Sequence, residues 1–112
     1  MALKEQMHGD VAVIDLKGKL MGGPETSAVH TKVKELVADG VKKVVFDLSK
    51  VTWMNSTGLG ALMGSMTTLR NADGDLKLSN VTDKVKSLFM ITKLITIFDT
   101  FDTVEDAINA FK

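Results

Sequence analysis

The chain has 112 residues, a formal net charge of zero at pH 7 and no cysteine. A length of this order suits one compact domain, so we expect a single domain over residues 1–112. The balanced charge gives no electrostatic attraction to nucleic acid or to an anionic membrane, and the absence of cysteine excludes disulfides and thiolate metal sites. No run approaches the ~18 apolar residues of a membrane span, and the first residues lack the apolar core of a signal peptide. We therefore expect a cytoplasmic protein, and the zero net charge leaves little repulsion against a homodimer.

The first part of the chain predicts two strands and a helix. Residues 3–7 and 11–16 flank a short polar turn, as in a β-hairpin. The glycines that begin at Gly18 are expected to end the second strand, and Pro24 suits the first turn of a helix because its missing N–H has no partner there. Apolar residues at helical spacing over residues 29–37 continue this helix, and the Asp-Gly pair after it predicts its end.

The middle of the chain contains its most regular patterns. Residues 41–48 include V-V-F-D-L, which is typical of a buried strand, and residues 49–52 are expected to be a brief connection. Apolar residues then recur at helical spacing from Leu59 to Leu69, which predicts an amphipathic helix. Trp53, before this helix, is expected to be an aromatic residue of the core or its rim.

The last part of the chain predicts two more strands, each followed or preceded by a helix. We expect residues 76–78 to form a short strand after a polar turn, and Asp83 to cap the helix that follows. Residues 95–98 are predicted to form the last strand. Thr103 then begins a capping-box pattern, which predicts a final helix. The order β-β-α-β-α-β-α-β-α predicts an α/β fold: a mixed, mostly parallel sheet with a leading hairpin and about four helices.

The segment W-M-N-S-T-G-L-G, residues 53–60, is the main candidate for chemistry, and a nucleophilic serine is the first interpretation to test. Ser56 would need a base within reach, but His8 falls in the first turn and His30 on the polar side of the first helix, where we expect it to be solvated. The motif G-x-S-x-G is absent. Two isolated histidines without cysteine also form no metal site. We therefore expect no enzyme, no catalytic residue and no metal ligand.

The second interpretation is a phosphate cradle. Gly58 and Gly60 lie where a strand gives way to a helix, and free N–H groups at a helix start attract anions. The sequence lacks both the Walker pattern and G-x-G-x-x-G, so the nucleotide signal is weak. The alternative is that Asn55 or Ser56 only caps the helix.

The third interpretation is a phosphorylation switch, because a helix start stabilises the charge of a phosphoserine. Opposite the apolar stripe, the second predicted helix carries small residues where a solvent-facing helix would normally carry charges: Thr57, Gly60, Ala61, Gly64 and Thr68. Such a face lets another chain approach closely, and a phosphate there would act as a wedge and a charge. Packing of the same face beneath a neighbouring element of this domain explains it equally well.

The segment V-V-F-D-L-S-K-V-T-W-M-N-S-T-G-L-G-A-L, residues 44–62, resembles the STAS domain of bacterial anti-sigma factor antagonists. The family pattern is a strand, D-L-S, and then [D/N]-S-[S/T]-G-L-G. The earlier L-K-G-K-L, residues 16–20, resembles the family's L-x-G-x-L, and the similarity extends over nearly the whole chain. Two departures remove negative charge near the serine, since the family often has Asp at the positions of Asn55 and Met21. This change favours a phosphorylated form or alters the contact with the kinase.

The resemblance implies a protein-binding switch. It implies that Ser56 is the phosphate acceptor, that the unmodified chain binds an anti-sigma factor that is also a serine-protein kinase, and that a phosphatase of the PP2C type resets it. The implied docking residues are Asn55, Thr57, Gly58, Gly60, Ala61, Gly64 and Thr68. ATP would belong to the partner, so no cofactor is expected in this chain. Two alternatives stay open: a non-phosphorylated STAS subunit of a transport or lipid-trafficking complex, and a STAS module that senses a nucleotide or anion.

Overall fold

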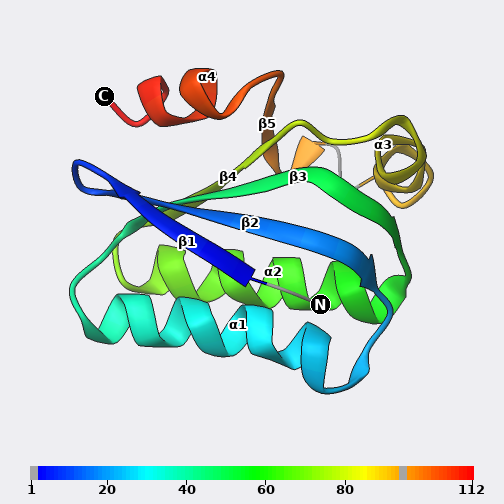
Figure 1. The fold of residues 1–112 in the computed structure, drawn as a ribbon, viewed down its shortest axis with the longest axis horizontal. Coiled ribbons are helices and arrows are strands. Elements are labelled where there is room, and N and C mark those ends of the chain that lie inside the picture. The colour runs from blue at the N-terminus through cyan, green and yellow to red at the C-terminus, as the bar shows by residue number, and fades with distance from the viewer. Residues whose placement is uncertain (1–2, 94–95) are drawn as a thin grey trace.

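The computed structural model describes residues 3–93 and 96–112. Within these residues it shows an α/β fold in which helices cover a five-stranded mixed sheet of order β1-β2-β3-β4-β5 (Figure 1). The strands are β1 (Leu3–His8), β2 (Val11–Leu20), β3 (Lys43–Met54), β4 (Asp75–Ser79) and β5 (Asp99–Phe101). The helices are α1 (Gly23–Ala38), α2 (Ser56–Asn71), α3 (Asp83–Ile91) and α4 (Val104–Asn109). The predicted fold class, with its leading hairpin, is confirmed.

The two faces of the sheet are covered unequally. β1 pairs antiparallel with β2, and the remaining neighbours pair parallel. Because each parallel crossover is right-handed, α1 and α2 lie side by side on the same face, as Figure 1 shows. Alternate side chains of the strands, such as Ile14, Phe46 and Leu78, fill the main core beneath these two helices. On the opposite face, α4 covers a smaller apolar cluster that includes Val13 and Val45.

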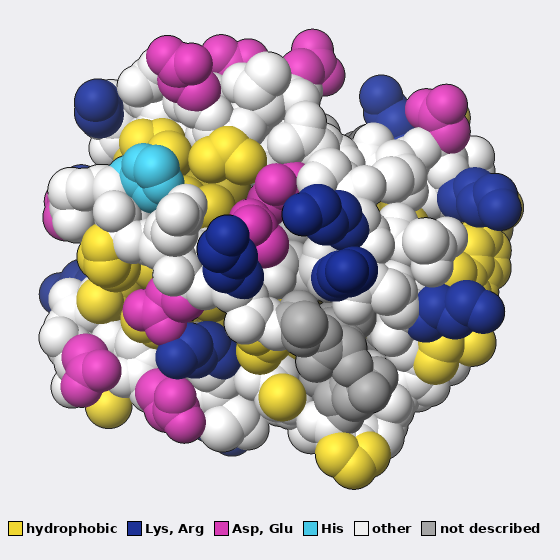
Figure 2. All heavy atoms as spheres, in the orientation of Figure 1, with side chains coloured by type: hydrophobic (Ala, Val, Ile, Leu, Met, Phe, Trp, Pro, Cys, Tyr) yellow, Lys and Arg dark blue, Asp and Glu magenta, His cyan; other side chains and the backbone are white. Residues whose placement is uncertain are grey.

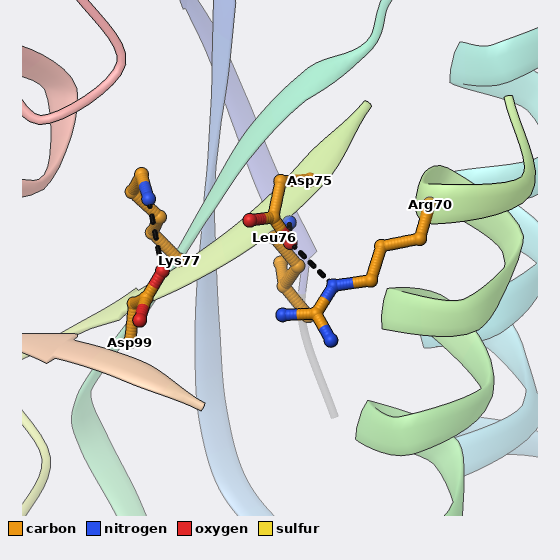
Figure 3. Close-up of polar contacts among 5 residues, drawn as sticks. All are labelled: Arg70, Asp75, Leu76, Lys77 and Asp99. Atoms are coloured by element: carbon orange, nitrogen blue, oxygen red, sulfur yellow. Dashed lines mark hydrogen bonds and ion pairs between the residues drawn. The ribbon is translucent and has the colours of Figure 1, made fainter. Parts of the chain in front are cut away.

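Polar contacts fix β4 on both sides (Figure 3). Arg70 at the end of α2 donates through Nε to Oδ1 of Asp75, at 3.0 Å. Two residues further along β4, the Lys77 ammonium lies 3.1 Å from Oδ2 of Asp99 on β5. The buried Lys77 ammonium also lies 4.8 Å from the centre of the Phe111 ring. These contacts join β4 to α2, to β5 and to the end of the chain beyond α4.

β2 and β3 are both longer than the sequence predicts. The prediction that β2 ends where the glycines begin is wrong, because Gly18 adopts a φ of 98° and β2 continues to Leu20, before Gly22 and Gly23. The predicted connection over residues 49–52 is instead part of β3. Shifts in the pairing register around Gly18 re-align the two strands, so that Leu20 pairs with Met54. This extension carries the end of β3 to the start of α2.

The predicted last strand, residues 95–98, is also wrong where the structure describes it. Residue 95 lies outside the described residues, and residues 96–98 form no strand. Phe98 is buried and stacks on Phe89 of α3, with ring centroids 5.6 Å apart, so this apolar residue packs in the core. β5 consists of the next three residues, which pair with β4.

Candidate functional site

Asn55 organises the start of α2. It has an extended backbone, and its Oδ1 accepts a hydrogen bond from the Gly58 N–H at 3.0 Å, which is the usual geometry of an N-cap. Its Nδ2 donates to the Met21 carbonyl at 2.9 Å, and its own N–H donates to the Leu20 carbonyl at 3.1 Å. One residue therefore holds together the end of β2, the loop that follows it and the first turn of α2.

Gly58 is required by the close approach of α2 to β2. The residue is buried, and a Cβ at this position would clash with the Leu20 carbonyl oxygen and lie 2.8 Å from the Leu20 Cβ. No larger residue fits without moving the helix away from the sheet. The glycine of the motif thus sets where the neighbouring hydroxyls lie.

Ser56 and Thr57 are both exposed in the first turn of α2. No hydrogen bond found among the described residues involves the Ser56 hydroxyl. The first turn contains no acidic residue, so the positive end of the helix dipole carries no compensating side-chain charge there. Gly60, one turn further on, is exposed, and a Cβ built there meets nothing within 4 Å. This end of α2 is open to solvent.

The small-residue face of α2 divides into an open part and a covered part. Ala61 is half-buried, whereas Gly64 and Thr68 lie against His30 of α1. His30 Nε2 is 2.8 Å from the Thr68 Oγ1, and a Cβ on Gly64 would lie 3.1 Å from the His30 Cε1. The packing interpretation is thus confirmed for the second part of the face, which lies against α1, and the first part is accessible to solvent.

The prediction that His30 is a solvated helix residue is wrong. Its ring is half-buried between α1 and α2, because Gly64 leaves room for it. Burial, together with the positive charge of Lys34, lowers the pKa of His30 below its ordinary value. The contact between His30 and Thr68 joins residues 38 positions apart, so no local pattern in the sequence predicts it.

Two large apolar side chains near the site were not assigned to it from the sequence. Met21 is 47% exposed and Trp53 is 39% exposed. Trp53 lies at the rim, one of the two places expected for it, close to the end of β3, and the Met21 backbone is bonded to Asn55. Exposed Trp and Met side chains are frequent at protein interfaces. The sequence signal that could have assigned them to the site is their position: Trp53 lies just before the motif, and Met21 follows L-K-G-K-L.

Two of the hollows on the surface lie at opposite ends of the molecule. One, of about 340 Å³, lies between α1 and α2 next to the candidate site, and its walls include Thr57, Ala61 and Lys34. The other, of about 690 Å³, lies between the β1–β2 turn and α4, at the starts of β2 and β3. Figure 2 shows hydrophobic side chains gathered there, below α4. Of these two hollows in the described part of the chain, the first adjoins Ser56 through its neighbour Thr57.

The described residues include no group of three His, Cys, Asp or Glu side chains placed to hold a metal ion. No helix within the described part of the chain has the length and hydrophobicity needed to cross a membrane. His8 ends β1, and His30 is bonded to Thr68.

The family model described as the STAS domain matches residues 3–107. The chain belongs to the STAS domain family. The resemblance carried by residues 44–62 is thereby confirmed for the family.

Curated relatives match a shorter part of this STAS chain. It is 35% identical over 71 residues to an anti-sigma-B factor antagonist of Staphylococcus aureus, a match that covers 63% of each protein. It is 38% identical over 63 residues to an anti-sigma-B factor antagonist of Listeria monocytogenes, covering 56% of this chain and 54% of the relative. The chain thus matches less than two thirds of the length of these relatives.

Solved structures share the fold over nearly the whole chain. The anti-sigma factor antagonist SpoIIAA in its unphosphorylated form matches with a TM-score of 0.76 at 23% identity, covering 98% of this chain and 97% of that one. The Bacillus SpoIIAA in its phosphorylated form matches with a TM-score of 0.76 at 22% identity, covering 99% of this chain and 100% of that one. An anti-sigma factor antagonist from Mycobacterium paratuberculosis matches with a TM-score of 0.81 at 24% identity, covering 97% and 92%.

Proposed function

We propose that this STAS chain is an anti-sigma factor antagonist controlled by phosphorylation of Ser56. In this proposal the unmodified chain binds an anti-sigma factor with serine kinase activity, and the phosphorylated chain releases it. The names of the curated relatives support the first part. The second part is supported by a fold relative that has been solved in an unphosphorylated and a phosphorylated form.

The observation that carries the proposal is the exposed serine at an uncompensated helix start. Ser56 is accessible to a kinase, and the first turn of α2 contains no acidic residue that would repel a phosphate. A phosphoserine adds about −1.5 to −2 charges at pH 7, and a helix N-terminus stabilises such a charge. The modified chain therefore stays folded.

The docking surface of this proposal is the open end of α2 with its surroundings. It comprises Ser56, Asn55, Thr57, Gly60 and Ala61, and we name it the Ser56 surface. Gly58 lies beneath this surface, where it allows α2 to approach β2 closely. Gly64 and Thr68 contact His30 and so position α1 next to the surface. The exposed Met21 side chain, whose backbone carbonyl is bonded to Asn55, adds apolar area beside it that a partner can bury.

Release follows from placing a charge within this interface. The backbone of α2 can approach a partner closely at Gly60, where no side chain intervenes. A phosphate on Ser56 would separate the two surfaces and would have to be desolvated on binding. Burying an unpaired charge costs several kcal/mol, on the order of 3–5, which is enough to dissociate a micromolar complex.

The test begins by capturing partners of the tagged chain from its native cells and identifying an anti-sigma factor by mass spectrometry. The purified pair is then titrated by calorimetry. We expect Ser56→Asp to weaken binding at least ~100-fold, about 2.7 kcal/mol, and Ser56→Ala to bind as the parent does. Ser87→Asp, which adds the same charge at an exposed position on α3, is the control and should bind normally.

Two results would contradict the proposal. If the parent chain binds no anti-sigma factor, the chain is not an antagonist. If Ser56→Asp and the parent bind equally well while both are folded by circular dichroism, the antagonist is not switched at Ser56. Intact-mass analysis of the chain from its native cells then locates any phosphate independently.

A further inference from the structure

The hollow of about 340 Å³ beside the Ser56 surface has a fixed floor. His30 is held by its contact with Thr68, and the buried Thr26 hydroxyl accepts a hydrogen bond from the Gly22 N–H at 2.8 Å. Both floor side chains are thus engaged within the chain, and the floor does not need a ligand to order it. A rigid concave surface of this kind loses little conformational entropy when a partner binds.

The rim of the hollow offers hydroxyl groups and a positive charge. Ser27, Thr31 and Thr57 are exposed around it, and each hydroxyl can donate a hydrogen bond. Lys34 is exposed and is the only Lys, Arg, Asp or Glu that lines the hollow among the side chains described. No negative group therefore balances the rim locally in the described part of the chain.

Within the described part of the chain, Lys32 and Lys34 of α1 differ in whether their charge is paired. On another side of the helix, Lys32 lies 2.7 Å from Glu5 of β1 and 3.9 Å from Glu35, so its charge is engaged by two carboxylates. No ion pair found among the described residues involves Lys34. Lys34 follows His30 by one helical turn on α1, and both residues line the hollow, so the positive charge lies at the space that His30 borders. Among the side chains described, Lys34 therefore gives the rim of the hollow a positive charge.

We infer that this hollow receives an acidic side chain of the protein that docks over Ser56, and that Lys34 pairs with it. The inference rests on the proposed function and names the chemistry of the partner at that site. Thr57 belongs both to the Ser56 surface and to the wall of the hollow. A partner of ordinary footprint, about 800 Å² per protein, that covers Ser56 also covers the adjacent hollow.

This placement gives a physical account of release. A carboxylate in the hollow sits beside the helix turn that carries Ser56. When Ser56 is phosphorylated, two negative groups meet at the same place, and repulsion between them opposes binding. The same partner side chain is thus attracted by Lys34 before phosphorylation and repelled by the phosphoserine after it.

The inference is tested with the anti-sigma factor identified by capture and purified, titrated against unphosphorylated variants. We expect Lys34→Glu to weaken binding at least ~10-fold and Lys34→Gln to weaken it less, because the first reverses the charge and the second only removes it. The affinity of Lys34→Gln should also depend less on salt than that of the parent. Lys42→Glu, an exposed lysine at the other end of β3, is the matched control and should bind normally.

A charge swap identifies the partner side chain. Exposed Asp and Glu residues of the anti-sigma factor are changed to Lys one at a time and titrated against Lys34→Glu. One of them should restore affinity to within about threefold of the parent pair, as expected for a direct ion pair measured by a double-mutant cycle.

The outcomes separate this inference from the proposed function. If Lys34→Glu binds like the parent while Ser56→Asp does not, the hollow receives no acidic group and the switch stands. If Lys34→Gln and Lys34→Glu weaken binding equally, without a change in salt dependence or any rescuing swap, the contact is not an ion pair and the inference is overturned. If the parent binds no anti-sigma factor, both fail.

Discussion

The starts of α2 and α4 use the same cap but differ in charge. In α2, Asn55 Oδ1 accepts from the Gly58 N–H at 3.0 Å; in α4, Thr103 Oγ1 accepts from the Asp106 N–H at the same distance. The first turn of α4 contains Glu105 and Asp106, which compensate the helix dipole. The first turn of α2 contains no acid.

The difference shows how one local structure can serve two purposes. At α4 the sequence provides the negative charge that the helix start prefers, so that end of the helix is electrostatically complete. At α2 that place is occupied by the exposed hydroxyls of Ser56 and Thr57. A phosphate on Ser56 would supply the charge that acidic side chains supply to α4. The absence of acid is thus the feature that makes the α2 start suitable for a reversible charge.

The largest effect expected at the α2 start comes from its glycines, which have no counterpart in α4. We expect Gly58→Ala to destabilise the chain by about 2–3 kcal/mol, because the added methyl group clashes with Leu20 and forces α2 away from β2. Gly60→Ala should be neutral or stabilising by up to about 1 kcal/mol, since its Cβ meets nothing and alanine favours a helix. Urea unfolding followed by circular dichroism measures both.

The two glycine variants control each other, because they make the same chemical change two residues apart, on the buried side and on the exposed side of one helix. Equal free energies of unfolding for the two variants would mean that α2 does not approach β2 as closely as described. Gly60→Ala also places a methyl group on the Ser56 surface, so binding to the anti-sigma factor is measured on the same samples.

The next effect comes from the caps themselves. Removing a capping side chain costs about 1 kcal/mol, so we expect Thr103→Ala to lose roughly that amount. Asn55→Ala should lose about 1 kcal/mol more, because Asn55 also donates a hydrogen bond to the Met21 carbonyl at 2.9 Å. Thermal or urea unfolding of the two alanine variants gives the difference.

Asn55→Asp separates the two roles of Asn55. Aspartate keeps the oxygen that accepts from the Gly58 N–H but has no N–H to donate to the Met21 carbonyl. We expect its stability to lie between those of the parent and Asn55→Ala. If Asn55→Ala is no less stable than Thr103→Ala, the hydrogen bond from Asn55 to the Met21 carbonyl contributes nothing to stability.

Much of this architecture follows from patterns along the chain. The buried strand signature of residues 44–48, the apolar stripe of α2 and the capping pattern at Thr103 are local features, and each predicts its element correctly. The position of Pro24 in the first turn of α1 is likewise set by its own backbone restriction. Local chemistry therefore determines the order of elements and, with the family motif, places Ser56 at a helix start.

The features missed from the sequence depend on contacts between distant segments. β3 extends through Met54 because β2 continues past Gly18 to pair with it, and neither strand shows this alone. Phe98 looks like part of a strand but is used for packing on Phe89. Part of the small face of α2 is covered because His30 of α1 fits against Gly64. Pairing register and helix–helix contacts are tertiary choices, so single-sequence patterns do not specify them.

The smallest expected effect is a change of stability with pH, and it arises in the part of α2 beyond its start. There His30 of α1 packs against α2, a contact that has no equivalent in α4. The folded chain holds the pKa of His30 below the ordinary value of about 6.5, because burial and Lys34 disfavour the charged ring. As pH falls below about 6.5, the unfolded chain takes up a proton at this residue before the folded chain does. The stabilising contribution of neutral His30 is therefore complete above that pH and is lost as the pH falls.

We expect the melting temperature of the parent to fall between pH 7.5 and pH 5.5, and His30→Gln to show a smaller fall, because glutamine can still bond to Thr68 but does not titrate. The same pH dependence in His30→Gln as in the parent would mean that the ring is not held between α1 and α2 as a neutral group. If His30→Gln loses the pH dependence, the histidine that lines the hollow beside Lys34 is uncharged at neutral pH. Lys34 is then the source of positive charge among the described residues of the hollow.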